Sequence, residues 1–130
     1  MTLHLNTLSV DSRDPAALAG FWSQALDWFV LMQSYDQALI APTQSREELP
    51  GAVAVPFLRN EDPKTDKNRW HFDLAPDDQD HEVARLEGLG ARRTDVGQHD
   101  VTWVVMADPE GNEFCVLHSL PATGELRRRL

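Results

Sequence analysis

The sequence is poor in cysteine and in positive charge, and it has no long hydrophobic run. Cys115 is the only cysteine among 130 residues, which excludes an intramolecular disulfide and leads us to expect the reducing cytoplasm. Lys and Arg number 12 against 21 Asp and Glu, and the net charge of -9 argues against a nucleic-acid partner. No apolar run approaches the roughly 20 residues that span a bilayer, and no secretory signal follows Met1, so we expect no membrane partner.

One order of elements occurs twice along the chain. In the first half, Asp14 is a candidate helix N-cap followed by Pro15, and apolar residues then recur at helical spacing as far as Leu26. Trp22 belongs to that apolar face, so we interpret it as a core residue rather than a ligand platform. Strands are predicted around this helix over 3–10, 28–33, 37–41 and 52–58.

The second half repeats this β-α-β-β-β order at a shift of 64 positions, which places His71 on Thr7 and Asp78 on Asp14. A helix is predicted over 78–89. Gly90 suits the left-handed backbone conformation that often ends a helix, so we expect this one to stop at residue 89. The fold class predicted is therefore α+β, with two tandem modules. The remaining strands are predicted over 71–75, 92–96, 101–107 and 113–118.

Polar composition separates the two halves. The stretch 59–69 contains Pro63 and almost no apolar side chain, which predicts an exposed linker. We predict a single domain, 1–130. Its parts are module one (1–58), the linker (59–69), module two (70–120) and a tail (121–130), whose arginines at 127–129 we expect to be solvated.

A turn signal introduces the last predicted strand. Asp108-Pro109-Glu110-Gly111-Asn112 interrupts an apolar run, as in a β-hairpin, and the strand resumes near Glu113. Residues two apart on a strand share a face, so Glu113 and Cys115 point to one side and Phe114 and Val116 to the other.

Two β-α-β-β-β modules in tandem, with Asp-Pro-Glu-Gly-Asn at 108–112 entering the final strand, resemble the vicinal oxygen chelate superfamily of glyoxalases, bleomycin-resistance proteins and extradiol dioxygenases. The segments 63–74 and 112–117 are similar to its glyoxalase-like domain subgroup. The resemblance implies the glyoxalase/bleomycin-resistance/dioxygenase fold, in which the modules form a curled mixed sheet. It also implies a small-molecule cavity in the cup of that sheet and a homodimer.

The resemblance also implies where a metal would bind. Members with a divalent metal hold it with His, Gln or Glu from the first and last strands of each module. Three of the four matching positions here are Thr7, His71 and Cys115, and the fourth falls on or near Leu58. Thr is a weak donor, Leu is none, and Cys is a soft ligand rather than one for hard ions. We therefore predict no metal site and no cofactor.

The resemblance implies that these positions still line the cavity without a metal, so His71, Asp73 and Cys115 are candidate site residues. His71 and Asp73 share a strand face, and a histidine near carboxylates is a candidate general acid or base, so His71 is the candidate catalytic residue. The alternative is a structural histidine paired with a carboxylate. Cys115 is either a nucleophile that needs His71 as its base or a small buried apolar residue.

Two further residues complete the predicted ligand-binding set of His71, Asp73, Trp103, Glu113 and Cys115. Trp103 is either an aromatic wall of a pocket or part of the core. Glu113 either contacts the ligand or pairs with Arg69 or Arg92.

The function predicted is metal-independent binding of a small organic molecule, with or without turnover. One alternative is a metal-dependent lyase, isomerase or dioxygenase, in which His71 and a carboxylate of the second half hold the ion. A second alternative is a partner-binding module without a ligand. Whether the protein is an enzyme stays open, and a glyoxalase-like lyase or isomerase is the class expected if it is one.

Overall fold

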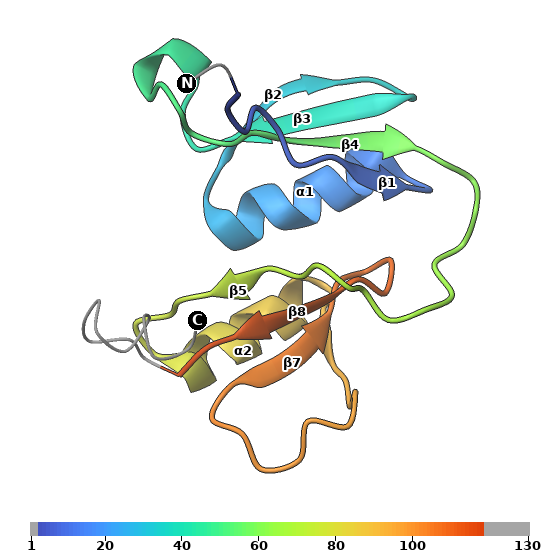
Figure 1. Cartoon of the computed structure of the whole chain (residues 1–130), viewed down its shortest axis with the longest axis vertical. Coiled ribbons are helices and arrows are strands. Elements are labelled where there is room, and N and C mark those ends of the chain that lie inside the picture. The colour runs from blue at the N-terminus through green and yellow to red at the C-terminus, as the bar shows by residue number, and fades with distance from the viewer. Residues whose placement is uncertain (1–2, 119–130) are drawn as a thin grey trace. The chain divides into compact units, whose positions relative to one another are not determined.

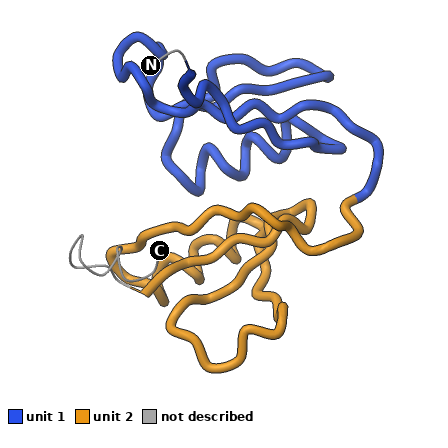
Figure 2. The backbone as a smooth tube through the Cα atoms, viewed as in Figure 1, with its two compact units in different colours: residues 1–63 blue, residues 64–130 orange. Residues whose placement is uncertain are grey.

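A computed structural model describes residues 3–118 of the chain, which divides into two compact units, 1–63 and 64–130 (Figure 2). The boundary lies within the predicted linker, 59–69. The single-domain organisation and the module bounds stay predictions. The predicted tail, 121–130, lies outside the described residues.

Unit 1 is a four-stranded mixed sheet with one helix packed against it (Figure 1). The strand order is β1-β4-β3-β2, in which β1 is parallel to β4 and the other neighbours are antiparallel. The elements are β1 (Val10–Ser12), α1 (Pro15–Leu26), β2 (Phe29–Gln33), β3 (Gln37–Ala41), the short 3-10 helix η1 (Arg46–Glu48) and β4 (Val55–Arg59).

Helix α1 begins and ends as the sequence predicts. The Asp14 carboxylate accepts a hydrogen bond from Ala17 N at 3.2 Å, and Pro15 occupies the first turn, where it loses no helical hydrogen bond. Trp22 is 3 % exposed and packs edge-to-face on Phe21, with ring centroids 5.1 Å apart. The interpretation of Trp22 as a core residue is therefore confirmed.

The first strand is the clearest misprediction. We predicted it over 3–10, whereas β1 begins at Val10, and within 3–9 only Thr7 forms a β-bridge, with Ala54. The prediction rests on the imperfect alternation of Leu3, Leu5 and Leu8 with polar residues, and Leu3 and Leu5 are 82 % and 67 % exposed. Alternation indicates a strand because one set of side chains faces a core, and these two leucines face none.

Unit 2 repeats the plan of unit 1 with shorter strands. Its sheet order is β5-β8-β7-β6, in which β5 is parallel to β8. Helix α2 begins after Asp78, which accepts from His81 N at 3.1 Å, and stops at Gly90 in the left-handed region (φ 119°). The elements are β5 (Asp73–Leu74), α2 (Gln79–Leu89), β6 (Arg92–Arg93), β7 (Val104–Ala107) and β8 (Glu113–Val116).

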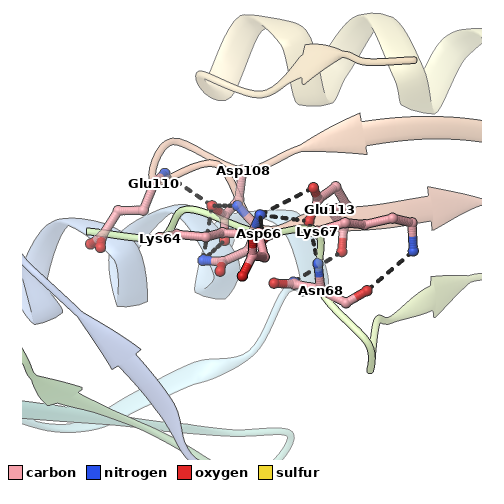
Figure 3. A network of polar contacts seen from close by, with 8 residues as sticks. Lys64, Asp66, Lys67, Asn68, Asp108, Glu110 and Glu113 are labelled. Carbon is pink, nitrogen blue, oxygen red and sulfur yellow. Dashed lines mark hydrogen bonds and ion pairs between the residues drawn. The ribbon is translucent and has the colours of Figure 1, made fainter. Parts of the chain in front are cut away.

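The turn before β8 is organised by a buried carboxylate. Asp108 is 1 % exposed, and its Oδ1 accepts hydrogen bonds from Glu110 N and Asn112 N, both at 2.9 Å (Figure 3). Gly111 N donates to Asp108 O, and Gly111 has φ 89°, a conformation that side chains other than glycine rarely adopt. The predicted hairpin between β7 and β8 is thus confirmed.

The α+β class and both β-α-β-β-β modules are confirmed. Hydrogen bonding gives each module an open four-stranded mixed sheet of its own. Within residues 3–118, no helix is long and apolar enough to cross a membrane.

Candidate functional site

A pocket of about 650 Å³ lies in unit 2, along strands β5, β7 and β8. All five side chains predicted to contact a ligand line it, which places residues from three separate parts of the sequence around one space. Their role in binding stays a prediction. The lining includes His71, Asp73, Trp103, Glu113 and Cys115, together with Lys67, Val96, Gly97, Gln98 and Val105.

Strand register brings the central residues together. In the parallel pair β5 and β8, Asp73 lies opposite Cys115, and in the antiparallel pair β7 and β8, Val105 lies opposite Cys115. Alternation then places Phe114 and Val116 on the other face of β8, where both are 1 % exposed. Phe114 nevertheless also lines the pocket, so the predicted separation of Glu113 and Cys115 from Phe114 is incomplete there.

His71, Asp73 and Cys115 form a compact polar cluster within the pocket. His71 Nδ1 lies 3.2 Å from Asp73 Oδ1, and one ring nitrogen, one carboxylate oxygen and the Cys115 Sγ all lie within 4.8 Å of one another. Cys115 is 8 % exposed, whereas the side chains of His71 and Asp73 are 37 % and 49 % exposed. The cluster therefore combines a buried thiol with an imidazole and a carboxylate that solvent reaches.

An apolar wall borders this cluster. Trp103 and Val96 are half-buried and pack against Val105, Cys115 and Leu117. Trp103 thus packs on apolar residues of unit 2 and also lines the pocket, and its contact with a ligand stays a prediction.

The loop 96–98 and Lys67 are pocket residues that the sequence did not reveal. Val96 N donates to Gln98 Oε1 at 2.8 Å, and Gly97 N donates to Asp95 Oδ1 at 2.7 Å, so local hydrogen bonds shape the loop. Gly97 has φ 86°. We predicted a strand over 92–96, whereas β6 ends at Arg93, and the one signal for a turn in this stretch was Gly97 itself.

Glu113 is held by the segment that precedes β5. Its Oε1 accepts a hydrogen bond from Asn68 N at 2.9 Å, and Lys64 Nζ lies 2.9 Å from Oε1 and 3.1 Å from Oε2 (Figure 3). The partner of Glu113 is thus Lys64 rather than Arg69 or Arg92, because the segment 64–68 lies against the start of β8. Lys64 and Asn68 are consequently half-buried, although they belong to a predicted exposed linker.

These contacts set the charge of Glu113. Burial alone would raise the pKa of its carboxyl, but the hydrogen bonds from Asn68 N and Lys64 and the charge of Lys64 outweigh burial and lower the pKa. Glu113 is therefore ionised at neutral pH, and both of its carboxylate oxygens are engaged in fixing the 64–68 segment. Its contact with a ligand stays a prediction.

The metal positions implied by the superfamily do not supply a chelating set. Leu74 of unit 2 pairs with Val116, and the corresponding residue of unit 1, Val10, pairs with Phe57. Phe57 therefore corresponds to Val116. The residue that corresponds to Cys115, one position earlier, is Pro56 rather than Leu58. Counting along loops misplaced this position by two residues, and neither residue offers a donor atom. A site drawn from both modules for a hard ion therefore does not fit. Within unit 2, His71, Asp73 and Cys115 lie close enough together to hold a soft cation.

Known proteins provide an independent comparison. None of the curated proteins matches this chain. A glyoxalase/bleomycin resistance protein/dioxygenase family enzyme from Burkholderia phytofirmans PsJN is similar in structure with a TM-score of 0.68 at 17 % identity, over 91 % of this chain and 100 % of the other. The fosfomycin resistance protein FosX from Mesorhizobium loti has a TM-score of 0.66 at 14 % identity, over 98 % and 100 %. The trypanothione-dependent glyoxalase I of Leishmania major has a TM-score of 0.64 at 12 % identity, over 98 % and 93 %.

At these identities the structural likenesses show the fold alone. The family comparison is more specific, because the model of the glyoxalase-like domain matches residues 7–117 and so covers both modules. The chain therefore belongs to the glyoxalase-like domain family.

Proposed function

We propose that this protein binds a small organic molecule in the unit 2 pocket without the help of a metal ion. The observation that carries the proposal is the convergence of His71, Asp73 and Cys115 beside an apolar wall in one pocket of about 650 Å³. Small-molecule sites typically combine an apolar lining with a few polar groups that orient the ligand.

The lining indicates the shape of the ligand. Trp103, Val96 and Val105 offer an apolar surface suited to a flat body. The imidazole of His71 and the carboxylate of Asp73 are exposed to the pocket, and together they offer both a hydrogen-bond donor and an acceptor. We expect a ligand with a planar apolar part and one polar group.

A thermal-shift screen with a broad set of metabolites, run in the presence of a chelator, tests the proposal. A ligand that binds the native state at 100 times its Kd stabilises it by about 2.7 kcal/mol, which raises the melting temperature by several degrees. Titration calorimetry of the hit should then show at least a tenfold loss of affinity in Trp103→Ala. Trp70→Ala is the matched control, because Trp70 is 84 % exposed and does not line the pocket. The proposal fails if no compound stabilises the protein, or if Trp103→Ala binds the hit as well as the control does.

A second candidate function is a metal-dependent lyase, isomerase or dioxygenase. The observation in its favour is that potential ligand atoms of His71, Asp73 and Cys115 all lie within 4.8 Å of one another. Elemental analysis of the purified protein separates the two candidates. One divalent ion per chain, lost together with His71→Ala, would replace the metal-independent proposal.

We also propose a homodimer, supported by exposed apolar residues on the sheet of unit 1. Phe29, Met32 and Leu58 are 44 %, 40 % and 36 % exposed, and the register places all three on the sheet face opposite buried Ile40. Sedimentation velocity should show a dimer that Met32→Glu dissociates. A monomeric wild-type protein at micromolar concentration would refute this part.

The remaining partner proposals rest on composition. The net charge of -9 disfavours a nucleic-acid partner, and the single cysteine supports a cytoplasmic location. A module that binds a protein partner and no ligand is the alternative to the whole proposal. A hit in the thermal-shift screen that depends on Trp103 would exclude it.

A further inference from the structure

We infer that the ligand of the unit 2 pocket is a planar carboxylic acid in its ionised form, and that Lys67 binds its carboxylate from a position that Glu113 fixes. The inference rests on the proposed function, because the acid must enter the same pocket. It goes further by giving the ligand a charge, and by assigning one residue that contacts this charge and one residue that positions the contact.

Lys67 brings a positive charge to the pocket that no carboxylate of the described residues balances. Lys67 lines the pocket, and its Nζ donates one hydrogen bond, to the backbone oxygen of Asn68 at 3.1 Å (Figure 3). None of the ion pairs formed among residues 3–118 includes Lys67. An ammonium group has three N–H donors, so two of them are available to an acceptor on a ligand.

The two carboxylates that line the pocket lie beside other groups. Lys64 Nζ lies 2.9 Å from Glu113 Oε1 and 3.1 Å from Oε2, so its charge offsets that of Glu113. Asp73 repels an anion, but it lies opposite Cys115, farther along β8 than Glu113. The Lys67 ammonium, in contrast, is bonded to Asn68, whose N–H donates to Glu113. The carboxylate of the ligand is therefore expected near the start of β8.

Glu113 holds the segment 64–68 on both sides of Lys67 (Figure 3). Before Lys67, the Lys64 side chain pairs with the Glu113 carboxylate, and after it, Asn68 N donates to Glu113 Oε1 at 2.9 Å. The segment contains no apolar residue, so hydrophobic packing does not fix it and these polar contacts do. Both oxygens of Glu113 are engaged in them, so Glu113 acts on the ligand by positioning Lys67.

The charge of the whole chain makes this local cation informative. A protein with a net charge of -9 repels acids in general, so binding of an acid needs a positive group at the site itself. Both lysines of the sequence belong to the segment 64–68, and Lys64 is paired with Glu113, which leaves Lys67 for the ligand.

The rest of the lining defines the body of the acid. Trp103, Val96 and Val105 form an apolar wall that suits a flat ring system. One ammonium group matches a single negative charge, and the carboxylate of Asp73 in the same pocket disfavours a second one. An aromatic acid with one carboxylate meets both conditions.

The test compares 2-naphthoate, a flat aromatic acid, with its neutral counterpart 2-naphthamide, by titration calorimetry of the intact protein at neutral pH and low ionic strength. We expect Lys67→Gln to weaken the binding of 2-naphthoate about fivefold, the upper range for an ion pair that solvent reaches, and to change the binding of 2-naphthamide less than about twofold. Arg69→Gln is the matched control, because it removes the same charge from a neighbouring exposed side chain that does not line the pocket. It should bind 2-naphthoate like the wild type.

Glu113→Gln tests the positioning role. Removal of a negative charge from the pocket would by itself strengthen the binding of an anion, whereas release of the segment 64–68 displaces Lys67 and weakens it. We expect Glu113→Gln to weaken the binding of 2-naphthoate about threefold and to leave that of 2-naphthamide within about twofold of the wild type. Stronger binding of 2-naphthoate would overturn the positioning role. If this variant fails to fold by circular dichroism, Glu113→Asp decides, because it keeps the charge but shortens the side chain, and it should also weaken the binding of 2-naphthoate.

Equal effects of Lys67→Gln on the two probes, or an equal loss of 2-naphthoate binding in Arg69→Gln, would overturn the inference. Failure of 2-naphthoate to bind the wild-type protein would overturn it as well. Failure of the charge assignment is distinguishable from failure of the proposed function, because neutral hits of the thermal-shift screen report on the pocket without an anion. A neutral ligand whose binding depends on Trp103 but not on Lys67 would leave the proposed function standing and reject the inference.

Discussion

The two units follow one plan, yet corresponding sheet positions carry different chemistry. Asp14 and Asp78 cap α1 and α2 in the same way, each accepting a hydrogen bond from the backbone N–H three residues later. The counterparts of His71, Asp73 and Cys115 in unit 1 are Thr7, Ser9 and Pro56.

This difference teaches that the elements of the fold and the chemistry of the site depend on separate residues. The helix N-caps and the strand order that build each module are kept in both. At the three positions compared, unit 2 carries titratable side chains where unit 1 carries Thr7, Ser9 and Pro56. The comparison yields four further predictions.

The largest effect should be the same in both units. Phe57 in β4 and Phe114 in β8 are 0 % and 1 % exposed, so replacing either with Ala removes a fully buried ring. We expect Phe57→Ala and Phe114→Ala each to lower the free energy of unfolding by about 3–5 kcal/mol, measured by urea denaturation. A loss below about 1 kcal/mol in one of them would show that the two cores are not equivalent.

The stability of unit 2 should depend on a polar residue in the turn before β8. Asp108→Ala leaves the N–H groups of Glu110 and Asn112 without their acceptor, and we expect it to lower the free energy of unfolding by roughly 2–4 kcal/mol. Asp95→Ala is the control, because Asp95 is exposed and accepts from Gly97 N. Similar small losses in both variants would contradict the structural role of Asp108.

Glu113 should make the stability of unit 2 depend on pH. Ala54, at the corresponding position of unit 1, cannot have this effect because it does not titrate. The pKa of Glu113 is lowered in the folded state, so its contribution to stability is present above the unfolded value of about 4.3 and is lost as the pH falls through the folded value. Glu113→Gln should lower the free energy of unfolding at pH 7 by about 1–3 kcal/mol and flatten its decline in acid. Unfolding measured from pH 7 to pH 2.5 checks this, with Glu87→Gln as the control because Glu87 is an exposed residue of α2. An equally steep acid decline in Glu113→Gln would contradict it.

The smallest loss of stability should again be about equal in the two units. Asp14→Ala and Asp78→Ala each remove one N-cap hydrogen bond, and we expect each to lower the free energy of unfolding by about 1 kcal/mol. The matched controls are Asp14→Asn and Asp78→Asn, since asparagine caps a helix about as well as aspartate. Losses that differ between the units by more than about 1 kcal/mol would show that one cap has a further role.

The sequence predicted several residues that line the pocket, but it did not predict which of them lie next to one another. The resemblance together with strand parity singled out His71, Asp73, Trp103, Glu113 and Cys115, and all five line one pocket, while their contact with a ligand stays a prediction. Parity alone could not show that Asp73 lies opposite Cys115, because that depends on the register between β5 and β8, about 40 residues apart.

Contacts between distant segments were the features that sequence patterns missed. The pairing of Glu113 with Lys64 spans 49 positions, and nothing in the composition of 59–69 distinguished Lys64 from its neighbours. The exposure of Leu3 and Leu5 was missed for the same reason, since alternation does not tell whether another element covers a strand.

The sequence by itself determined the repeated β-α-β-β-β order, the ends of both helices and the turn at 108–112. These features depend on local spacing and on the backbone preferences of Asp, Pro and Gly. Only the tertiary structure decided that His71, Asp73 and Cys115 share one pocket and that Glu113 anchors the 64–68 segment. Both depend on strand register and long-range packing, which bring together residues that no local preference connects.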